Sequence, residues 1–246
     1  MPDLNWGMKV KSLPLLAFLA LAQVAAAQAP SAAPAEAKAP ARAGPSEEAI
    51  ARRARSVERL AAESIVIPPD LPVIADSSAA KVKSRDEIAQ RAIAVCLCAL
   101  KAEGATQETI DDLVKRYKAK KFFTAAEWEF VDNNAQTNSD RNMYLWRYEG
   151  LVVLMWALGY AETLERPDSN CDVRATVRYL SSRTTEQFIA EAKPRSAAEI
   201  LDEADLIQRY NWAINDARKR GRSAPGGLDR HIVQERLTIL NWLVGR

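Results

Sequence analysis

The chain has 246 residues, of which 48% are apolar and 27% are charged, with 9 glycines and 12 prolines. This composition is that of a globular protein long enough to bury a sizeable core. Its 34 basic and 32 acidic residues are nearly balanced and well mixed along the chain. The sequence therefore lacks the basic patch typical of nucleic-acid-binding proteins, and its low net charge implies no strongly charged partner.

Residues 1–27 have the pattern of a secretory signal peptide. Lys9 and Lys11 precede an apolar run over residues 13–24, and Ala25-Ala26-Ala27 supplies the small residues of a cleavage site; Met8 is an alternative start. An uncleaved membrane anchor is the competing interpretation, but the run is shorter than the roughly 18–20 residues that a span needs. We therefore expect a periplasmic or secreted protein that keeps no stable membrane anchor after cleavage.

The sequence up to residue 82 does not have the pattern of the main domain. Residues 28–45 are rich in alanine and proline, which predicts an extended linker. A charged helix is expected at 46–64, and Ile67-Pro68-Pro69-Asp70-Leu71-Pro72 ends it, so residues 46–82 read as a helical extension with a proline-rich connector. The main domain is expected at residues 83–246.

From residue 83 onward the apolar periodicity is helical, and alternating strands with hairpin turns are missing. Capping boxes of the form Ser/Thr-x-x-Glu/Gln mark helix starts at Ser84, Thr124, Thr184 and Ser196, and Asp229 is expected to cap the last helix. Helices are predicted at 84–103, 107–119, 124–133, 138–161, 172–182, 184–192, 196–220 and 229–244. The sequence thus predicts an all-α, orthogonal multi-helix bundle, with one main domain and an N-terminal helical extension.

The predicted helix at 138–161 is apolar on nearly every face, which is the pattern of a buried, central helix. Glu149 lies within this pattern. A buried charge is costly unless it is paired, so Glu149 is expected either to meet an arginine or to face a cleft. Arginine suits a carboxylate because its guanidinium can bind both oxygens, and Arg236 and Arg218 are the candidate partners.

Several short motifs lie between about Arg85 and Gly245: Ala102-Glu103-Gly104, Trp146-Arg147-x-Glu149, Leu154-x-Trp156-Ala157-Leu158-Gly159, Cys171-Asp172, Trp212-Ala213, Asp216-Ala217-Arg218 and Glu235-Arg236-x-x-x-Leu240-Asn241-Trp242-Leu243. With these motifs the chain resembles the bacterial family known as domain of unknown function 4272. Their order and spacing extend over nearly all of the main domain. The resemblance implies an all-helical domain and carries no activity.

Three tracts place polar side chains and a tryptophan inside apolar helical patterns, and they supply the candidate site. Its residues are Trp146, Arg147, Glu149, Asp172, Asn211, Trp212, Asp216, Arg218, Glu235, Arg236, Asn241 and Trp242. One interpretation is a polar pocket walled by the three tryptophans, which would bind a small polar or anionic ligand. The other is an ion-pair network that fixes the packing of the helices.

Two functional hypotheses follow. The first is an exported, non-catalytic binding or interaction module, whose partner is a small polar ligand or another protein. The alternative is a cell-envelope hydrolase in which Glu149 works with Glu235 or Asp172. A Glu149 with a free oxygen in an open cleft would favour the enzyme, and a sealed, fully hydrogen-bonded Glu149 would favour a structural role. His231 is expected to be an exposed residue of the last helix, and no nucleophile motif occurs.

The three cysteines allow one intrachain disulfide, Cys171 with Cys96 or Cys98, because the latter two lie on different sides of one helix. The competing interpretation is three small buried apolar side chains. No metal site is expected, since the Cys-x-Cys spacing and a single histidine fit no ordinary zinc site. No phosphate-binding loop or dinucleotide motif occurs, so no cofactor is expected.

Overall fold

The computed structural model describes residues 44–246, so the predicted signal peptide and all but the last two residues of the predicted linker lie outside the described part of the chain. Within that part the chain forms α-helices and two short 3₁₀ helices and no strands, which confirms the all-α class. The helices are α1 (Glu47–Ala62), α2 (Arg85–Glu103), α3 (Gln107–Tyr117), η1 (Ala119–Phe122), α4 (Ala125–Asp132), α5 (Asn138–Leu145), α6 (Arg147–Ala157), α7 (Val173–Ser181), α8 (Thr185–Glu191), α9 (Ala197–Lys219), η2 (Pro225–Gly227) and α10 (Arg230–Leu243).

The helix starts are set by local hydrogen bonds. The capping boxes predicted at Ser84, Thr124, Thr184 and Ser196 are all formed, and Asp229 accepts hydrogen bonds from the first turn of α10. A further box joins Thr137 to Asp140 at the start of α5. Each box satisfies backbone N–H groups that a helix start leaves free, which is why the predicted starts lie within a residue of the observed ones.

The predicted helix at 138–161 is two helices and is shorter at its end. Trp146 separates α5 from α6, and the Glu149 N–H bonds the Trp146 carbonyl at 3.0 Å, a separation of three residues where an α-helix has four. At the other end Gly159 has a φ of +78° and begins the return of the chain. A Cβ at this glycine would lie 2.3 Å from the carbonyl oxygen of Lys193, so only glycine fits.

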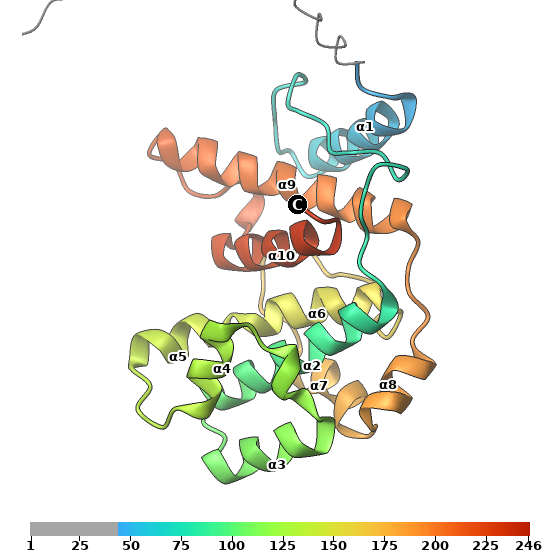
Figure 1. Ribbon diagram of the computed structural model, residues 1–246. Coiled ribbons are helices and arrows are strands. Elements are labelled where there is room, and N and C mark those ends of the chain that lie inside the picture. Colours follow the sequence, from blue (N-terminus) through green and yellow to red (C-terminus); the bar gives the residue numbers. More distant parts are fainter. Residues whose placement is uncertain (1–43) are drawn as a thin grey trace, which may run out of the picture. The chain divides into compact units, whose positions relative to one another are not determined.

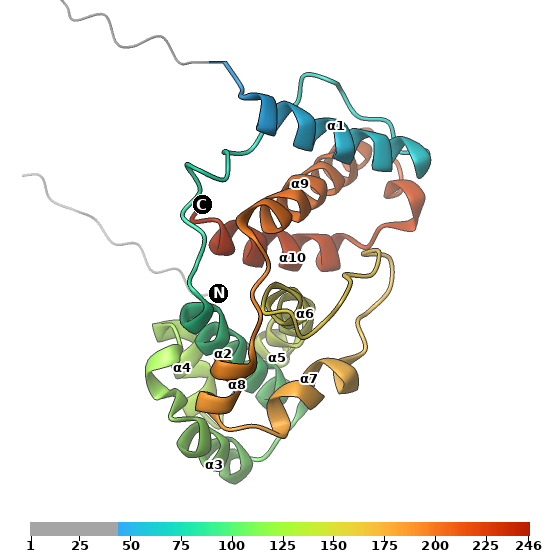
Figure 2. The ribbon, with the colours of Figure 1, turned by 90° about the vertical axis from the view of Figure 1, so that its right-hand side faces the viewer.

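The helices lie in successive layers (Figures 1 and 2). α1 packs on α9, α9 on α10, α10 on α6, and α6 on α2, while α3, α4, α5 and α8 surround α2. The two inner helices, α2 and α6, are buried on nearly every side. The central position predicted for the 138–161 segment is confirmed for α6.

α1 belongs to the same compact unit as the rest of the described chain, Gly44–Arg246. Sequence patterning treated residues 46–82 as an extension outside the main domain. In the structure Leu60 of α1 and Ile65 and Ile74 of the connector are buried in the main core. The first helix and its connector are therefore a layer of the domain.

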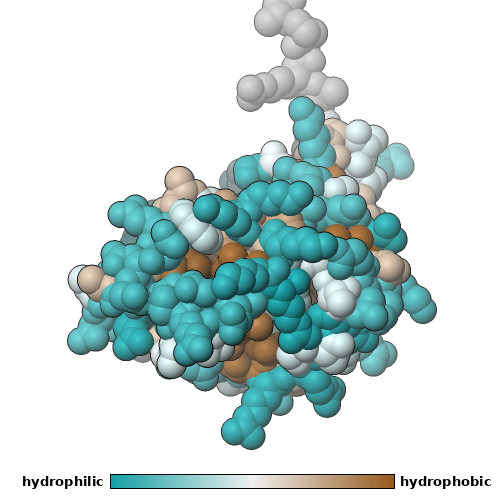
Figure 3. Space-filling model, turned by 60° about the horizontal axis from the view of Figure 1, so that its bottom comes forward, coloured by the Kyte–Doolittle hydropathy of each residue, from teal (hydrophilic) through white to brown (hydrophobic). Residues whose placement is uncertain are grey.

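Most of the surface shown in Figure 3 is hydrophilic, with hydrophobic residues visible only in small areas between polar side chains. Among the described residues the exposed large apolar side chains are Ile50, Val66, Met143 and Leu145. Isolated exposures of this kind are ordinary on a globular surface. In the described part of the chain, no helix is long and apolar enough to cross a membrane.

Candidate functional site

Glu149 and Arg236 form an ion pair in the interior, between α6 and α10. Oε2 of Glu149 accepts hydrogen bonds from Nε and Nη2 of Arg236 at 3.2 and 3.0 Å, and both side chains are almost completely buried. Sequence analysis predicts Arg236 or Arg218 as the partner of Glu149. The partner is Arg236, whereas Arg218 is exposed near the end of α9.

The remaining polar atoms of this pair also have partners. Oε1 of Glu149 accepts a hydrogen bond from the backbone N–H of Cys171 at 2.6 Å, and Nη1 of Arg236 donates to the Glu165 carbonyl at 2.6 Å. Both carboxylate oxygens are therefore satisfied, and the pair ties α6 and α10 to the segment before α7. This geometry is that of a structural ion pair, and it gives Glu149 no free oxygen for proton transfer.

A second ion pair lies beside the first. Nη1 of Arg147 donates to Oε1 of Glu235 at 2.8 Å, and both side chains are largely buried. Nε of Arg147 is buried and has no hydrogen-bond partner among the described residues. Next to this pair Trp146 stacks on His231, with ring centres 4.8 Å apart. His231 is exposed, as predicted, and its stacking holds it at the start of α10.

Two other acidic residues of the predicted set make no hydrogen bond with these pairs. Asp172 is exposed and caps α7 by accepting from the Ala175 N–H at 3.0 Å. Asp216 pairs with Arg220 at 3.0 Å near the end of α9. Of the two carboxylates that the hydrolase hypothesis paired with Glu149, Asp172 is a helix cap and Glu235 is bound to Arg147.

Two asparagines of the set are polar groups within the helix packing. Oδ1 of Asn211 accepts from Nδ2 of Asn215, one turn further along α9, at 3.2 Å. Oδ1 of Asn241 is buried and has no partner among the described residues. An unpaired buried oxygen is uncommon and marks a place where water or a ligand can bind. None of the other candidate site residues forms a hydrogen bond with it.

The three tryptophans do not wall one pocket. Trp146 lines a cavity with Glu149, Trp242 lines a different cavity with Arg147, and Trp212 packs against the main core. The expectation of a single tryptophan-walled pocket is thus wrong. Arg147 lines the cavity of Trp242. Trp146 is the residue before it and points to a different side of the helix axis, so Trp146 lines another cavity.

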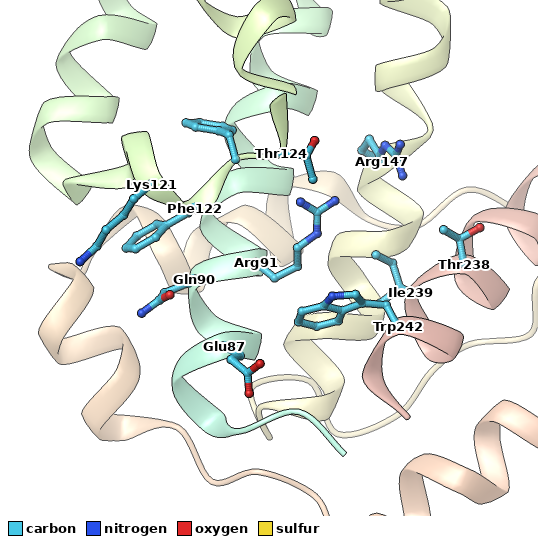
Figure 4. Close-up of a pocket in the computed structure, with 11 residues that line it drawn as sticks. Glu87, Gln90, Arg91, Lys121, Phe122, Thr124, Arg147, Thr238, Ile239 and Trp242 are labelled. Carbon is cyan, nitrogen blue, oxygen red and sulfur yellow. The ribbon is translucent and has the colours of Figure 1, made fainter. Parts of the chain in front are cut away.

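The cavity lined by Trp242 has a volume of about 340 Å³ and lies between α2, η1, α6 and α10 (Figure 4). Arg91 from α2 and Trp242 from α10 lie near the middle of the view, with Phe122 on one side and Arg147 on the other. Lys121 also lines it. Three of the lining side chains are cations, and one acidic side chain, Glu87, also lies on the wall.

The Arg91 guanidinium is held in place from behind. Its Nη1 and Nη2 each donate to one oxygen of Glu127 at 2.6 Å, and both side chains are mostly buried. Arg91 and the Thr124 N–H together keep the pKa of Glu127 low in spite of its burial, so the pair stays ionised. Arg91 and Arg147 are therefore fixed cations on the wall of the cavity, each held by a carboxylate.

A larger cavity, of about 550 Å³, lies beside the Glu149–Arg236 pair. Tyr148 and Glu103 line it and bond each other at 2.6 Å, and Cys171 lies at its edge. Burial and the neighbouring Glu149 raise the pKa of the Cys171 thiol to about 12. A thiol with this pKa is a poor nucleophile at neutral pH.

The cysteines form no disulfide. Cys96 and Cys98 are fully buried in α2, and Cys171 is a partly buried free thiol. The bridge from Cys171 to Cys96 or Cys98 is therefore not formed in the structure, in which Cys96 and Cys98 pack as small apolar side chains. Within residues 44–246 no group of His, Cys, Asp or Glu side chains has the arrangement of a metal site.

Sequence reasoning missed Arg91, Lys121 and Phe122, which line the cavity in Figure 4, and Glu127, which binds Arg91. A signal existed for the first two. Arg91 lies in the otherwise apolar stretch of α2, and Glu127 is buried at the third position of α4. The capping-box pattern predicts only the first role of Glu127, and the ion pair with Arg91 is its second role. Lys121 and Phe122 follow a predicted helix end and carry no pattern.

A search of the curated proteins and a search of the solved structures each found no match to the chain. One family model matches, over residues 52–246. The match begins in α1, more than thirty residues before the first motif recognised in the sequence, and includes every helix described above after the first turn of α1. The chain therefore belongs to the family described as domain of unknown function (DUF4272).

Proposed function

We propose that this protein is an exported, non-catalytic binding module whose cavity between α2, η1, α6 and α10 takes a small organic anion with an aromatic or other flat apolar part. The observation that carries the proposal is the chemistry of the cavity wall. Arg91, Arg147 and Lys121 supply positive charge, and Trp242 and Phe122 supply aromatic surface. Pockets of this composition recognise ligands by apolar contact together with a few charged groups.

The two arginines are suited to binding because their positions are fixed in advance. Glu127 binds Arg91 and Glu235 binds Arg147, so both guanidinium groups are already ordered before a ligand binds, and binding loses little side-chain entropy. Arg147 donates one hydrogen bond among the described residues and keeps further N–H donors for an anion. A bidentate carboxylate or a sulfonate complements such donors.

The hydrolase alternative is less well supported. A general acid needs a carboxyl that reaches substrate and changes protonation near the working pH. Glu149 has both oxygens occupied, and Glu235 and Asp172 have structural partners. Export rests on the signal-peptide pattern of residues 1–27, and the proposal places the protein in the periplasm or outside the cell.

The test compares three ligands of similar size and different charge: indole-3-acetate, indole and tryptamine. Calorimetric titration of the purified protein should show indole-3-acetate binding at least about tenfold more tightly than the neutral or cationic compound. The Lys121→Gln variant should weaken binding of indole-3-acetate about two- to fivefold. Lys120→Gln is the matched control, because Lys120 is the adjacent cation but lies over the Trp128 ring, outside the cavity.

Equal affinity for the three ligands, or an equal effect of the two lysine variants, would contradict the proposed anion site. Added salt should weaken binding of indole-3-acetate more than it weakens binding of indole, since only the anion makes screened contacts.

A further inference from the structure

A separate cavity, of about 280 Å³, lies between α1 and α9, in the outer layer of the fold. Arg55 and Arg59 of α1 line one side of it, and Asp202, Glu203 and Leu206 of α9 line the other. Trp156, from α6, also lines it. Cavities of a few hundred cubic ångströms are the size that small ligands occupy.

Most charged groups around this cavity already have partners of opposite sign. Asp202 accepts from Arg52 at 3.2 Å and from Arg55 at 2.6 and 2.7 Å. Glu199 accepts from the N-cap Ser196 and from Arg195, at 2.9 Å or less. These groups hold α1 against α9 and the start of α9 in place, and they leave little capacity for a ligand.

One carboxyl and one guanidinium are the exceptions. Glu203 makes no hydrogen bond or ion pair with any described residue, although it is partly buried. Arg59 makes a single long hydrogen bond, 3.4 Å from its Nε to Glu63, and its side chain is 56% exposed. Glu63 is already bound by Tyr210 at 2.6 Å and by Arg166 at 3.0 Å. Arg59, which also interacts with Tyr210, thus keeps free N–H donors.

We infer that this cavity binds a small zwitterion, a free amino acid with an apolar side chain. Its carboxylate would lie on Arg59, its ammonium on Glu203, and its apolar side chain against Trp156 and Leu206. The reason is complementarity: the cavity wall leaves one group of each sign without a close partner, and no ion pair joins the two. A partly buried carboxyl without a partner is costly, and a ligand ammonium would remove that cost.

The protonation of Glu203 supports the inference. Burial raises the pKa of Glu203, while Arg236 of α10 and Arg59 of α1 act in the opposite direction, and Asp202 adds to the rise. Arg236 is committed to Glu149, and Asp202 to the arginines of α1. A ligand ammonium beside Glu203 would favour its ionised form, so at an acidic pH where Glu203 is partly protonated a zwitterion releases a proton on binding. A simple anion would raise the pKa of Glu203 further and cause proton uptake.

The experiment uses L-leucine and two analogues that each lack one charge: 4-methylpentanoate, without the ammonium, and 3-methylbutylamine, without the carboxylate. Calorimetry on the purified full chain should show leucine binding at least about tenfold more tightly than either analogue, as expected for the loss of one charged hydrogen bond. Repeating the titration in buffers of different ionisation enthalpy counts protons, and release is the expected sign.

Two variants test the two charged contacts, that of the ammonium with Glu203 and that of the carboxylate with Arg59. Glu203→Gln should remove the preference for leucine over 4-methylpentanoate, and Arg59→Gln should remove the preference for leucine over 3-methylbutylamine. Arg53→Gln is the matched control, since Arg53 is on the same helix and does not line the cavity. Each variant changes a side chain without a close partner, so folding should be retained and is checked by the melting temperature.

The inference is overturned if leucine binds no better than its analogues, if binding takes up protons, or if Arg53→Gln and Arg59→Gln behave alike. The α1–α9 cavity and the cavity in Figure 4 share no lining residue. Failure of the leucine titration therefore leaves the indole-3-acetate result standing, and the reverse also holds.

Discussion

Two glutamates, Glu149 of α6 and Glu203 of α9, show how differently this fold treats an acidic side chain. Glu149 is sealed in the interior, with Arg236 on one oxygen and the Cys171 N–H on the other. Glu203 lies in a cavity between helices and has no partner among the described residues. The difference teaches that Glu149, which the apolar sequence around it singles out, has a structural role. Glu203, which the sequence pattern does not single out, is the carboxylate that remains able to bind a ligand.

The largest expected effect lies on the sealed side of this comparison. Arg236→Ala leaves Glu149 charged and buried without its guanidinium, and the free energy of unfolding should fall by about 3–5 kcal/mol. Urea unfolding followed by circular dichroism measures the change. The double change Arg236→Met with Glu149→Leu removes both charges and should recover much of the loss. An unchanged stability in Arg236→Ala would show that the ion pair does not hold α6 to α10.

A smaller effect is expected from Gly150, where α6 and α10 approach each other closely. A Cβ at this position would lie 2.8 Å from Cγ1 of Ile239 and 3.3 Å from Oε1 of Glu235. Gly150→Ala should therefore lower stability by about 1–3 kcal/mol through overpacking, although alanine is the better helix former. The melting temperature reports the change.

The control for this prediction is a double change. Ile239→Ala provides space for the added methyl group, so Gly150→Ala should cost less in that background than alone, a non-additivity that a mutant cycle measures. Equal costs in the two backgrounds would show that the helices separate freely and that this contact does not help to seal Glu149.

The smallest effect concerns pH and compares two glutamates on the same helix. The pKa of Glu203 is raised in the folded state by burial, so its contribution to stability is fully present below the unfolded pKa and is lost as the pH rises through the folded pKa. Glu203→Gln should therefore stabilise the protein relative to the native chain at neutral pH, by on the order of 1 kcal/mol, and this advantage should vanish in acid.

Glu199, four residues earlier, should behave in the opposite way. Hydrogen bonds from Ser196 and Arg195 lower its pKa, so its contribution is present above the unfolded pKa and is lost as the pH falls through the folded pKa. Glu199→Gln keeps the capping geometry and should show no gain at neutral pH. Chemical unfolding of both variants between about pH 4 and pH 8 makes the comparison. If the two substitutions changed stability in the same direction as the pH rises, the environments described for the two side chains would be contradicted.

Much of the fold is predictable from the sequence because helix starts are local. A hydroxyl at the N-cap and an acid or amide three residues later determine where the first turn begins, and those positions agree with the structure at Ser84, Thr124, Thr184 and Ser196. The box at Thr137 was missed because its third residue is Asp140 rather than a glutamate or glutamine. The break at Trp146 has no sequence signal, since no glycine or proline marks it.

The candidate site was only partly predictable. Periodicity placed Glu149 and Arg236 on buried faces and gave their pairing as one of two choices, but it could not separate Arg236 from Arg218. That choice depends on which turn of a neighbouring helix lies opposite Glu149. Periodicity also grouped Trp146, Trp212 and Trp242, which lie in three different places, because a helical repeat gives the side of a helix and not its neighbours.

The sequence by itself determined the all-α class, most helix limits and the need for a partner at Glu149, because capping and burial of charge act over a few residues. Only the tertiary structure decided which arginine meets that carboxylate, that α1 is a layer of the domain, and that Glu203 and Arg59 line one cavity without pairing. Those outcomes depend on how helices far apart in sequence pack together, and that packing is set by the fit of whole helix faces.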